Sequence, residues 1–472
     1  MPSIIWGGLY LTHAPDNALH NDHDPASDSA VTPHTSVFSA FQRELYDWRL
    51  WTGRGLVLAF AALAGLTVVA FTWMTETAFE HFTEFRVGYW WGPLFWIPFS
   101  TAAIVWLTRK FAPGAAGSGI PQVMAALDPA VHRENRSLYV SIKLTVAKML
   151  LTTWGLLAGL SLGREGPSVQ IAAGVMHHAR RWLPDRSRVS EHGMMMAGGA
   201  AGIAAAFNTP LGGVMFAIEE LTRRPEQRSN GLLLAAIVLG GLMAVSVYGN
   251  STYFGVIRVQ NLSVALILPG LLVALCCGLA GGLFSRLLIV SLSGKSNDWF
   301  SQWRRKAPVR FAAACGLAIA VLGVLTHGDT YGSGYDHTRN MLEGNGEASS
   351  LYVLLKFIAT WITTWAGVPA GIFAPSLAIG GALGNDIAQW MSYPNAATLI
   401  ALGMAGFLAA VTQAPLTSFI IVMEMIDGHA LVLSLMATTL VASGVSRLIS
   451  APLYPSLAGL QLLRLPPTSP KA

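Results

Sequence analysis

The sequence predicts an all-α polytopic membrane protein that is built from two repeats. Of its 472 residues, 53% are hydrophobic and 12% are charged, whereas soluble domains carry about 25% charged residues. Apolar runs close to the roughly 20 residues that cross a bilayer recur along the chain. The clear runs begin near Gly55, Trp90, Leu138, Leu232, Val264 and Val309.

Polar segments are expected at both ends of this membrane region. Residues 1–37 are rich in His, Asp, Pro and Ser and have no apolar stretch typical of a signal peptide, so we expect a disordered tail. The first repeat is predicted over residues 38–250 and the second over 251–465. A short tail, 466–472, would then end the chain without a cytoplasmic regulatory domain.

Several apolar segments inside the repeats are too short to span a membrane. One runs from Ser118 to Asp128, another from Glu165 to about His178, and a third from Gly371 to about Gly384. Half-helices at membrane depth are tolerated where they face protein or a wet cavity. In secondary transporters such broken segments come in pairs, one from each repeat, and mark the binding site.

The duplication is visible as two pairs of similar stretches. "GREGPS" from Gly163 and "GIFAPS" from Gly371 share their glycine and proline positions. "AAGIAAAFNTPLGGVMFAIEE" from Ala200 aligns with "AGFLAAVTQAPLTSFIIVMEM" from Ala405. The two pairs occur in the same order and with nearly the same offset, which favours duplication over chance similarity of apolar helices.

Three stretches share a glycine before an expected helix start and a proline in its first turn. They are "GSGIP" (117–121), "GREGP" (163–167) and "GIFAP" (371–375). Proline suits the first turn because amides there have no partner within the helix. The free N–H groups and the positive end of the helix dipole attract anions. Three converging helix starts would bind a small anion without a fixed cation, which would hold the ion too tightly for transport.

At this point the sequence resembles the CLC family of chloride channels and transporters. The three motifs stand intact and in order, Tyr454 follows in "APLYP", and the likeness covers roughly residues 40–465. The resemblance implies two inverted-topology repeats of tilted, broken helices and a homodimer with one pore per protomer. It places the anion at Gly117, Ser118, Gly166, Ile372, Phe373 and Tyr454.

The resemblance also makes Glu165 the gate and the outer proton acceptor. A carboxylate at a helix start competes with an anion for the same amides, and protonation removes its attraction to them. The alternative is a glutamate that caps the helix or pairs with Arg164.

Glu219 and Glu220 are expected to differ in role. Glu219 matches Glu424 in the other repeat, so it is interpreted as architectural, whereas Glu220 matches Met425. By the resemblance, Glu220 falls at the inner proton-transfer glutamate of the exchanger branch. The alternative is a helix-end charge that is balanced by Arg223 and Arg224.

Three further polar or variable positions bear on selectivity and coupling. Serine at position 118 favours chloride by the resemblance, although a lone serine is more often a helix cap. Gln122 and Met124 stand where several bacterial exchangers carry acids, which leaves the efficiency of coupling open. Lys148 is left out of the site because snorkelling or pairing with an acid explains a buried lysine equally well.

The function predicted from the sequence is chloride/proton antiport. A passive chloride channel of the same fold is the first alternative, and an intramembrane hydrolase with Ser118 as nucleophile is the second. We expect chloride, protons and the lipid bilayer as partners, with no nucleic acid, cofactor, metal or disulfide. The localisation expected is a bacterial inner membrane, with both termini in the cytoplasm and basic pairs in cytoplasmic loops.

Overall fold

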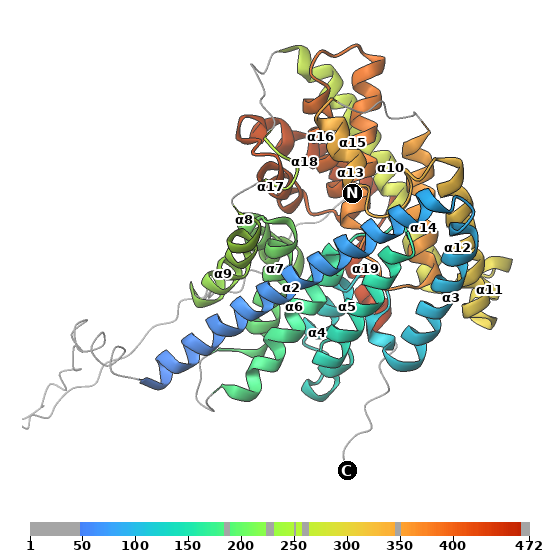
Figure 1. The fold of residues 1–472 in the computed structure, drawn as a ribbon. Coiled ribbons are helices and arrows are strands. Elements are labelled where there is room, and N and C mark those ends of the chain that lie inside the picture. Colours follow the sequence, from blue (N-terminus) through green and yellow to red (C-terminus); the bar gives the residue numbers. More distant parts are fainter. Residues whose placement is uncertain are drawn as a thin grey trace, which may run out of the picture. The chain divides into compact units, whose positions relative to one another are not determined.

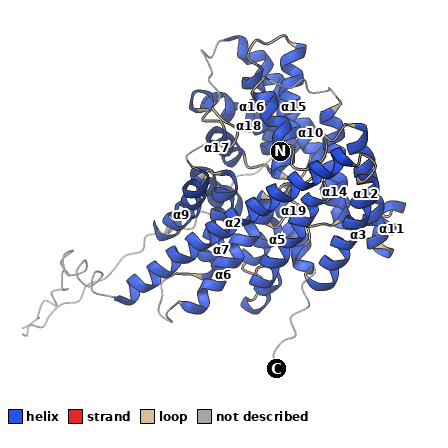
Figure 2. Ribbon diagram, in the orientation of Figure 1, coloured by secondary structure: helices blue, strands red, loops and turns tan. Residues whose placement is uncertain are grey.

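The computed structural model describes residues 48–183, 189–222, 231–249, 252–256, 264–344 and 351–463. The two predicted tails and the Arg223–Arg224 pair lie outside these ranges. The described chain is helical, with loops between the helices (Figure 2). Its strand-like pairing is an isolated antiparallel bridge between Gly163 and Gly371.

The helices follow one another along the whole described chain (Figure 1). The α-helices are α2 (Trp48–Gly88), α3 (Pro93–Phe111), α4 (Ile120–Leu127), α5 (Ile142–Leu157), α6 (Glu165–Ala179), α7 (Glu191–Phe207), α8 (Pro210–Phe216), α9 (Gly231–Tyr248), α10 (Ile267–Ser293), α11 (Trp299–Lys306), α12 (Pro308–Leu325), α13 (Tyr335–Leu342), α14 (Tyr352–Ala366), α15 (Phe373–Trp390), α16 (Ala396–Thr412), α17 (Pro415–Met425), α18 (Val432–Ile449) and α19 (Leu453–Leu462). Short 3₁₀ turns are η1 (Pro113–Ala115), η2 (Arg133–Leu138), η3 (Arg180–Trp182), η5 (Val264–Leu266) and η6 (His429–Leu431), and η4 (Ala217–Thr222) is a π-helical turn.

Within the described residues, six helical stretches are long and apolar enough to cross a membrane. They are Trp51–Gly88, Arg133–Leu157, Gly231–Tyr248, Val264–Ser293, Pro308–Leu325 and His429–Ile449. The first five stretches contain five of the six predicted run starts, all except Trp90. The sixth stretch was not predicted from the sequence. The run expected near Trp90 forms α3, whose last turn contains Arg109 and Lys110. The prediction of an all-helical, multi-span membrane protein is confirmed.

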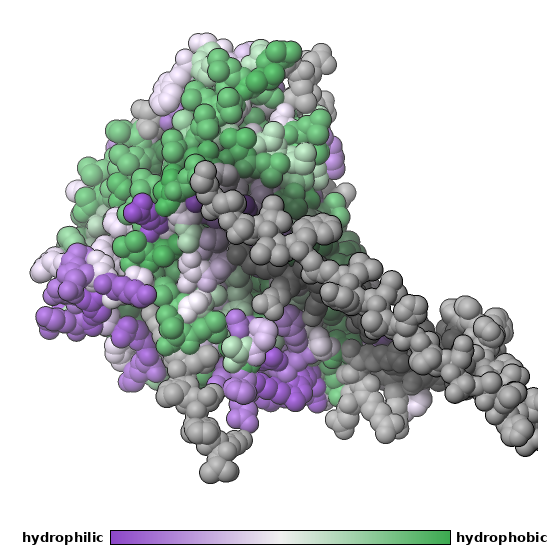
Figure 3. Space-filling model, turned by 180° about the vertical axis from the view of Figure 1, so that it is seen from behind, coloured by the Kyte–Doolittle hydropathy of each residue, from purple (hydrophilic) through white to green (hydrophobic). Residues whose placement is uncertain are grey.

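The surface is apolar over much of its area. Hydrophobic residues cover a broad part of the face seen in Figure 3, while hydrophilic residues gather in patches toward the lower edge. One such patch lies over the region of α11, whose last residues are Arg304, Arg305 and Lys306. This distribution suits a protein surrounded by lipid with polar ends in water.

The predicted broken helices are present. α4 has eight residues and begins after Gly119, α6 begins at Glu165, and α15 begins at Phe373. Each carries a proline in its first turn, as expected. The glycine directly precedes only α4, because Arg164 and Ile372 occupy the cap positions of α6 and α15. α15 extends to Trp390, farther than the sequence indicated.

Corresponding helices of the two halves pack alike. α6 packs against α7, and α15 packs against α16 in the same way. α7 and α16 both end in a non-glycine residue in the left-handed region, Asn208 at φ 57° and Gln413 at φ 58°. Each is followed by a helix that starts with proline, α8 or α17. The aligned stretches therefore adopt the same backbone course, including an uncommon conformation.

Glu219 and Glu424 join the two halves by reciprocal bonds. The Glu219 carboxylate accepts from the amides of Leu416 at 3.1 Å and Thr417 at 2.6 Å. The Glu424 carboxylate accepts from the amides of Leu211 at 3.1 Å and Gly212 at 2.7 Å. Each acid thus satisfies first-turn amides of the other half's helix, α17 or α8, which have no partner within their own helix.

Replacing Glu219 by glutamine should destabilise the protein without touching the pore. A hydrogen bond to a charged group contributes about 1.5–3 kcal/mol. Glutamine keeps one acceptor oxygen but loses the charge, so we expect a loss of roughly 1–2 kcal/mol. Thermal unfolding of the purified protein measures it, with the exposed Glu80→Gln as the matched control. Equal unfolding midpoints for the two variants would contradict the bridging role.

Candidate functional site

The motifs "GREGP" and "GIFAP", which are far apart in the sequence, are connected by backbone hydrogen bonds. The Gly163 amide donates to the Gly371 carbonyl at 2.8 Å, and the Gly371 amide donates to the Gly163 carbonyl at 3.0 Å. The "GSGIP" loop is tied to the same place. The Gly117 amide donates to the Val368 carbonyl and the Ala370 amide to the Gly117 carbonyl, both at 3.1 Å. The starts of α4, α6 and α15 are therefore held together, as the sequence predicted.

Glu165 reaches from the start of α6 to the start of α15. Its side chain is fully buried, and its Oε2 accepts from the Ala374 amide at 3.4 Å. Its Oε1 makes no hydrogen bond with any described residue. The carboxylate thus lies at the positive end of an 18-residue helix from the other half of the chain. This is where a free anion would be attracted.

Ser118 and Tyr454 bring two hydroxyls to the same region. Both residues are buried, their side chains lie close to each other, and neither hydroxyl makes a hydrogen bond of normal geometry in the described part of the chain. The Tyr454 ring stacks on Phe373 with centroids 6.0 Å apart. Buried hydroxyls normally have a hydrogen-bond partner, so this pair is suited to a ligand that accepts hydrogen bonds, as an anion does.

Gly166 allows the close approach of these elements. A Cβ at this position would collide with the Ser118 hydroxyl and lie within 3.3 Å of the Gly371 Cα. Gly117 has a different part in the site. Its φ of 74° favours glycine, and its amide is already bound to Val368, so Gly117 shapes the loop. Ile372 caps α15, and Phe373 begins it, so their amides stand at the start of this helix, while their binding of an anion stays a prediction.

Glu220 is a second buried carboxylate in the electrostatic neighbourhood of Tyr454. It is 1% exposed and belongs to the π-helical turn after α8. The Tyr454 hydroxyl is close enough to both Glu220 and Glu165 to interact with their carboxylates electrostatically. A hydroxyl near two buried carboxylates both donates and accepts hydrogen bonds. The sequence named these three residues, and the fold brings them into one neighbourhood.

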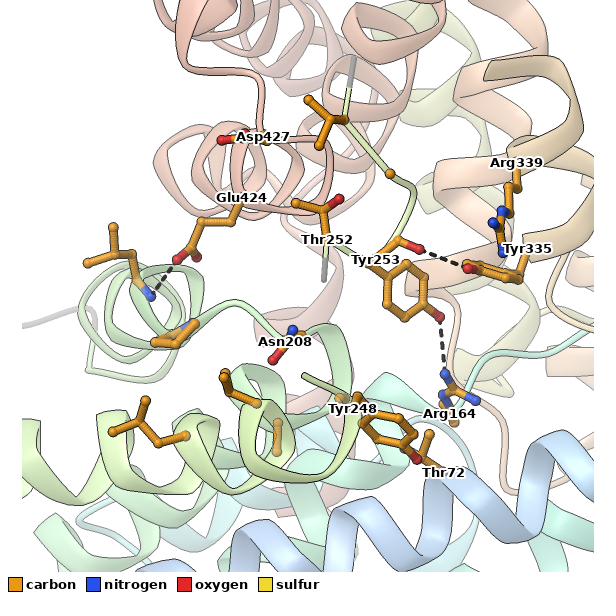
Figure 4. Close-up of a pocket in the computed structure, with 18 of the residues that line it drawn as sticks. Thr72, Arg164, Asn208, Tyr248, Thr252, Tyr253, Tyr335, Arg339, Glu424 and Asp427 are labelled. Carbon is orange, nitrogen blue, oxygen red and sulfur yellow. Dashed lines mark hydrogen bonds between the residues drawn. The ribbon is translucent and has the colours of Figure 1, made fainter. Parts of the chain in front are cut away.

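Arg164 does not pair with Glu165. Its Nη1 lies 2.7 Å from Oε1 of Glu76 on α2, and its Nη2 donates to the Tyr253 hydroxyl at 3.3 Å. Figure 4 shows Arg164 and Tyr253 facing the same cavity, with Tyr335 donating to the Tyr253 carbonyl at 2.8 Å. The alternative interpretation of Glu165 as a partner of Arg164 therefore loses its support.

The cavity in front of Arg164 is about 940 Å³ in volume. Its polar lining includes Arg164, Arg339, Asn208, Glu424 and Asp427 (Figure 4). Arg164, which lines the cavity, is the residue directly before the buried Glu165. The described lining includes neither Glu165 itself nor the first residues of α15.

Two buried lysines hold the loops that precede short helices. Lys148 Nζ donates to the carbonyls of Gly117 at 2.6 Å and Ala115 at 2.7 Å. It neither snorkels nor pairs with an acid. Lys356 Nζ donates to the Gly332 carbonyl at 2.8 Å, and to those of Thr330 and Tyr331. Each lysine thereby neutralises carbonyl dipoles that a loop turns inward.

Lys356 and its loop were missed from the sequence, although a signal was present. Residues 332–334 read Gly-Ser-Gly, as residues 117–119 do, and each triplet precedes an eight-residue helix, α13 or α4. Lys356 follows Lys148 by the same spacing that separates Gly371 from Gly163. Comparing the repeats at that offset would have identified Lys356, and the repeated Gly-Ser-Gly triplet would have identified its loop.

Gln122 closes the first loop. Its side-chain oxygen accepts from the Gly119 amide at 3.0 Å, and its side-chain nitrogen donates to the Ala116 carbonyl. The residue is 2% exposed. Gln122 therefore stabilises the turn that presents Ser118, so a neutral amide at this position has a structural task of its own.

Comparison with known proteins places this arrangement in context. The family profile described as "Voltage gated chloride channel" matches residues 100–447. The H(+)/Cl(-) exchange transporter ClcA of Citrobacter koseri is 32% identical in an alignment of 427 residues that covers 85% of this chain and 87% of that protein. ClcA of Salmonella arizonae is also 32% identical, over 79% of this chain and 80% of its own.

The fold of this chain is also similar to those of solved structures. A slow cyanobacterial Cl⁻/H⁺ antiporter superposes with a TM-score of 0.73 at 24% identity, covering 88% of this chain and 98% of its own. A CLC-type fluoride/proton antiporter superposes with a TM-score of 0.70 at 22% identity, covering 90% of this chain and 99% of its own. At these identities the likeness concerns the fold.

Proposed function

This chain belongs to the voltage-gated chloride channel (CLC) family, and from that premise we propose that it is a chloride/proton antiporter. Chloride moves through a pore that is lined by the starts of α4, α6 and α15. Glu165 alternately takes the place of the anion and accepts a proton. Glu220 exchanges that proton with the solution on the inner side.

The observation that carries the proposal is the position of the Glu165 carboxylate at the Ala374 amide. An anionic side chain fixed at a helix start behaves as a tethered substitute for a diffusing anion. When chloride arrives, the two compete for the same amides. When the carboxylate binds a proton, it loses its charge-assisted attraction to these amides and releases them. Anion entry is thereby linked to protonation.

The inner proton step is assigned to Glu220. Glu220 is buried, and the Tyr454 hydroxyl interacts electrostatically with both Glu220 and Glu165. In the other half Met425 stands at the corresponding place, so only one half carries this acid. A second titratable group apart from the gate gives the proton an inner route that chloride does not share in full.

Chloride is the anion we propose, and Ser118 with Tyr454 bind it. The curated relatives at 32% identity are named as exchangers of protons and chloride, although one protein of similar fold exchanges fluoride. The Ser118 and Tyr454 hydroxyls supply two donors next to the helix starts. Two neutral donors and helix ends bind a monovalent anion with moderate strength, which permits release.

The assembly we propose is a homodimer with one pore in each protomer. Within a protomer the first repeat spans residues 38–250 and the second 251–465, in inverted orientation. The reciprocal Glu219 and Glu424 bonds and the Gly163–Gly371 pairing support a local two-fold relation between the halves. We place the protein in a bacterial inner membrane with cytoplasmic termini.

Reconstitution into liposomes tests the function. We expect an outward chloride gradient to drive protons uphill into the vesicles, so that external pH rises after potassium and valinomycin set the voltage. Rapid chloride flux without proton movement would replace the antiporter by a passive channel. Substituting fluoride for chloride in the same assay tests the anion, and faster coupled exchange with fluoride would overturn the chloride assignment.

A further inference from the structure

A second cavity lies at the opposite end of α6 from Glu165. Its volume is about 840 Å³. Its walls come from η2, from the start of α5, from the end of α6 with η3, and from the start of α7. A helix of 15 residues is about 22 Å long, so this cavity is distant from the anion-binding helix starts and belongs to another part of the molecule.

Cations outnumber acids in this cavity. Glu191 is the one carboxylate among its described lining residues, which include Arg133, Lys143, Arg180 and Arg181. The histidines His177 and His178 lie between them. The charge balance is therefore strongly positive, unlike that of the cavity in front of Arg164, where basic and acidic residues alternate.

Glu191 fixes some of these cations in place. Its Oε2 lies 3.3 Å from Arg133 Nε and 3.3 Å from Arg136 Nη1, and it also contacts Arg180. Its Oε1 lies 3.3 Å from His177 Nδ1. Three guanidinium groups share a single carboxylate, so their charge is only partly neutralised. An additional anion beside them would lower the mutual repulsion.

Two cations are left for such an anion. Lys143 and Arg181 make no hydrogen bond or ion pair with the described residues, and both are exposed at the cavity. Lys143 belongs to the first turn of α5, whose cap Ser141 accepts from the Leu144 amide. The amides of Ile142 and Lys143 therefore remain at the open, positive end of a 16-residue helix.

Exposed apolar side chains adjoin the cavity: Ile142 lines it, and Leu138 and Trp182 directly follow the lining residues Ser137 and Arg181 in the chain. Trp182 is 67% exposed, Leu138 is 49% exposed and Ile142 is 39% exposed. Tryptophan gathers at the membrane–water interface, where its ring lies at the level of lipid headgroups. A basic cavity beside exposed apolar residues is suited to the headgroup of a lipid whose chains lie along Leu138 and Ile142.

We propose that this cavity binds a phosphate group, that of an anionic phospholipid of the surrounding membrane. Lys143 and Arg181 contact the phosphate over the first turn of α5. Arg180 and Arg133, held by Glu191, provide the remaining positive field. A basic cavity of this kind faces the cytoplasm by the positive-inside rule.

The test compares two double variants of the full-length protein. Lys143→Gln with Arg181→Gln removes the two available cations. Lys306→Gln with Arg310→Gln removes the same charge from two exposed residues elsewhere and is the matched control. Each protein is purified in detergent micelles that contain either phosphatidylglycerol or phosphatidylcholine, and bound lipids are counted by native mass spectrometry.

We expect the unmodified protein and the control to retain phosphatidylglycerol over phosphatidylcholine. Each cation near a membrane surface contributes about fivefold in affinity, so the cavity variant should bind phosphatidylglycerol about thirtyfold more weakly. Thermal unfolding and chloride flux should be unchanged, because neither residue lies in the pore. Equal retention of phosphatidylglycerol by all three proteins would overturn the lipid assignment.

A second arm identifies the source of the phosphate. Inorganic phosphate is titrated into the same proteins in micelles without anionic lipid, and heat of binding is measured. Binding that depends on Lys143 and Arg181, together with equal lipid retention, would assign the cavity to a soluble phosphate compound. If neither lipid nor phosphate binding depends on these residues, the cavity is not a phosphate site.

Discussion

Glu165→Gln should leave chloride flux intact, remove proton coupling and make the flux insensitive to pH. Glutamine is neutral at every pH, so it cannot compete with chloride for the Ala374 amide as a carboxylate does. It also cannot accept the transported proton. In the unmodified protein, lowering the pH protonates Glu165 and frees the amides, so flux should rise by up to about tenfold per pH unit.

Chloride efflux from liposomes and proton uptake are recorded together over a series of pH values. Glu80→Gln, an exposed acid on α2, is the matched control and should behave as the unmodified protein. Retained uphill proton movement in Glu165→Gln would refute the gate assignment. A chloride flux that still follows pH would show that another group controls access to the pore.

Glu220→Gln should abolish proton movement while chloride continues to flow. Removing a positioned proton-transfer group costs about a hundredfold or more in rate, whereas the chloride contacts that we propose for Ser118, Tyr454 and the α15 start do not involve Glu220. The chloride flux should continue to respond to pH, because Glu165 is still present. This response separates the two glutamates, since Glu165→Gln loses it.

The same liposome assay measures both fluxes. Glu220→Asp is the informative companion variant, because it keeps a titratable carboxyl group and should restore part of the proton movement. If Glu220→Gln stops chloride as well, Glu220 is a structural acid, and thermal unfolding should then show a lowered midpoint. Full proton coupling in Glu220→Gln would place the inner proton route elsewhere.

Much of the architecture follows from the sequence, because local chemistry determines it. A glycine ahead of a helix start with proline in its first turn marks a helix that begins inside the membrane, and α4, α6 and α15 begin where these motifs stand. The shared acid of the two repeats was correctly interpreted as architectural, since Glu219 and Glu424 satisfy helix-start amides. These helix starts are set by neighbouring residues, so one sequence suffices to find them, whereas the end of α15 at Trp390 was not found in this way.

The partners of the buried charges were decided by the tertiary structure alone. Arg164 lies directly before Glu165 and yet pairs with Glu76 on α2. Lys148 binds loop carbonyls and contacts no acid. Local periodicity contains no information on which helix packs against which, whereas a buried charge takes whatever partner that packing brings within hydrogen-bond distance.

The sequence by itself thus determined that this is a membrane protein with two repeats and broken helices. It also identified two acids, Glu165 and Glu220, that have no counterpart in the second repeat. Only the tertiary structure decided that the Glu165 carboxylate reaches the start of α15, a helix from the other half of the chain. The physical reason is that the unpaired amides of a helix start bind whichever anionic group the tertiary packing brings close to them. Nothing in the local sequence around Glu165 specifies which helix that is.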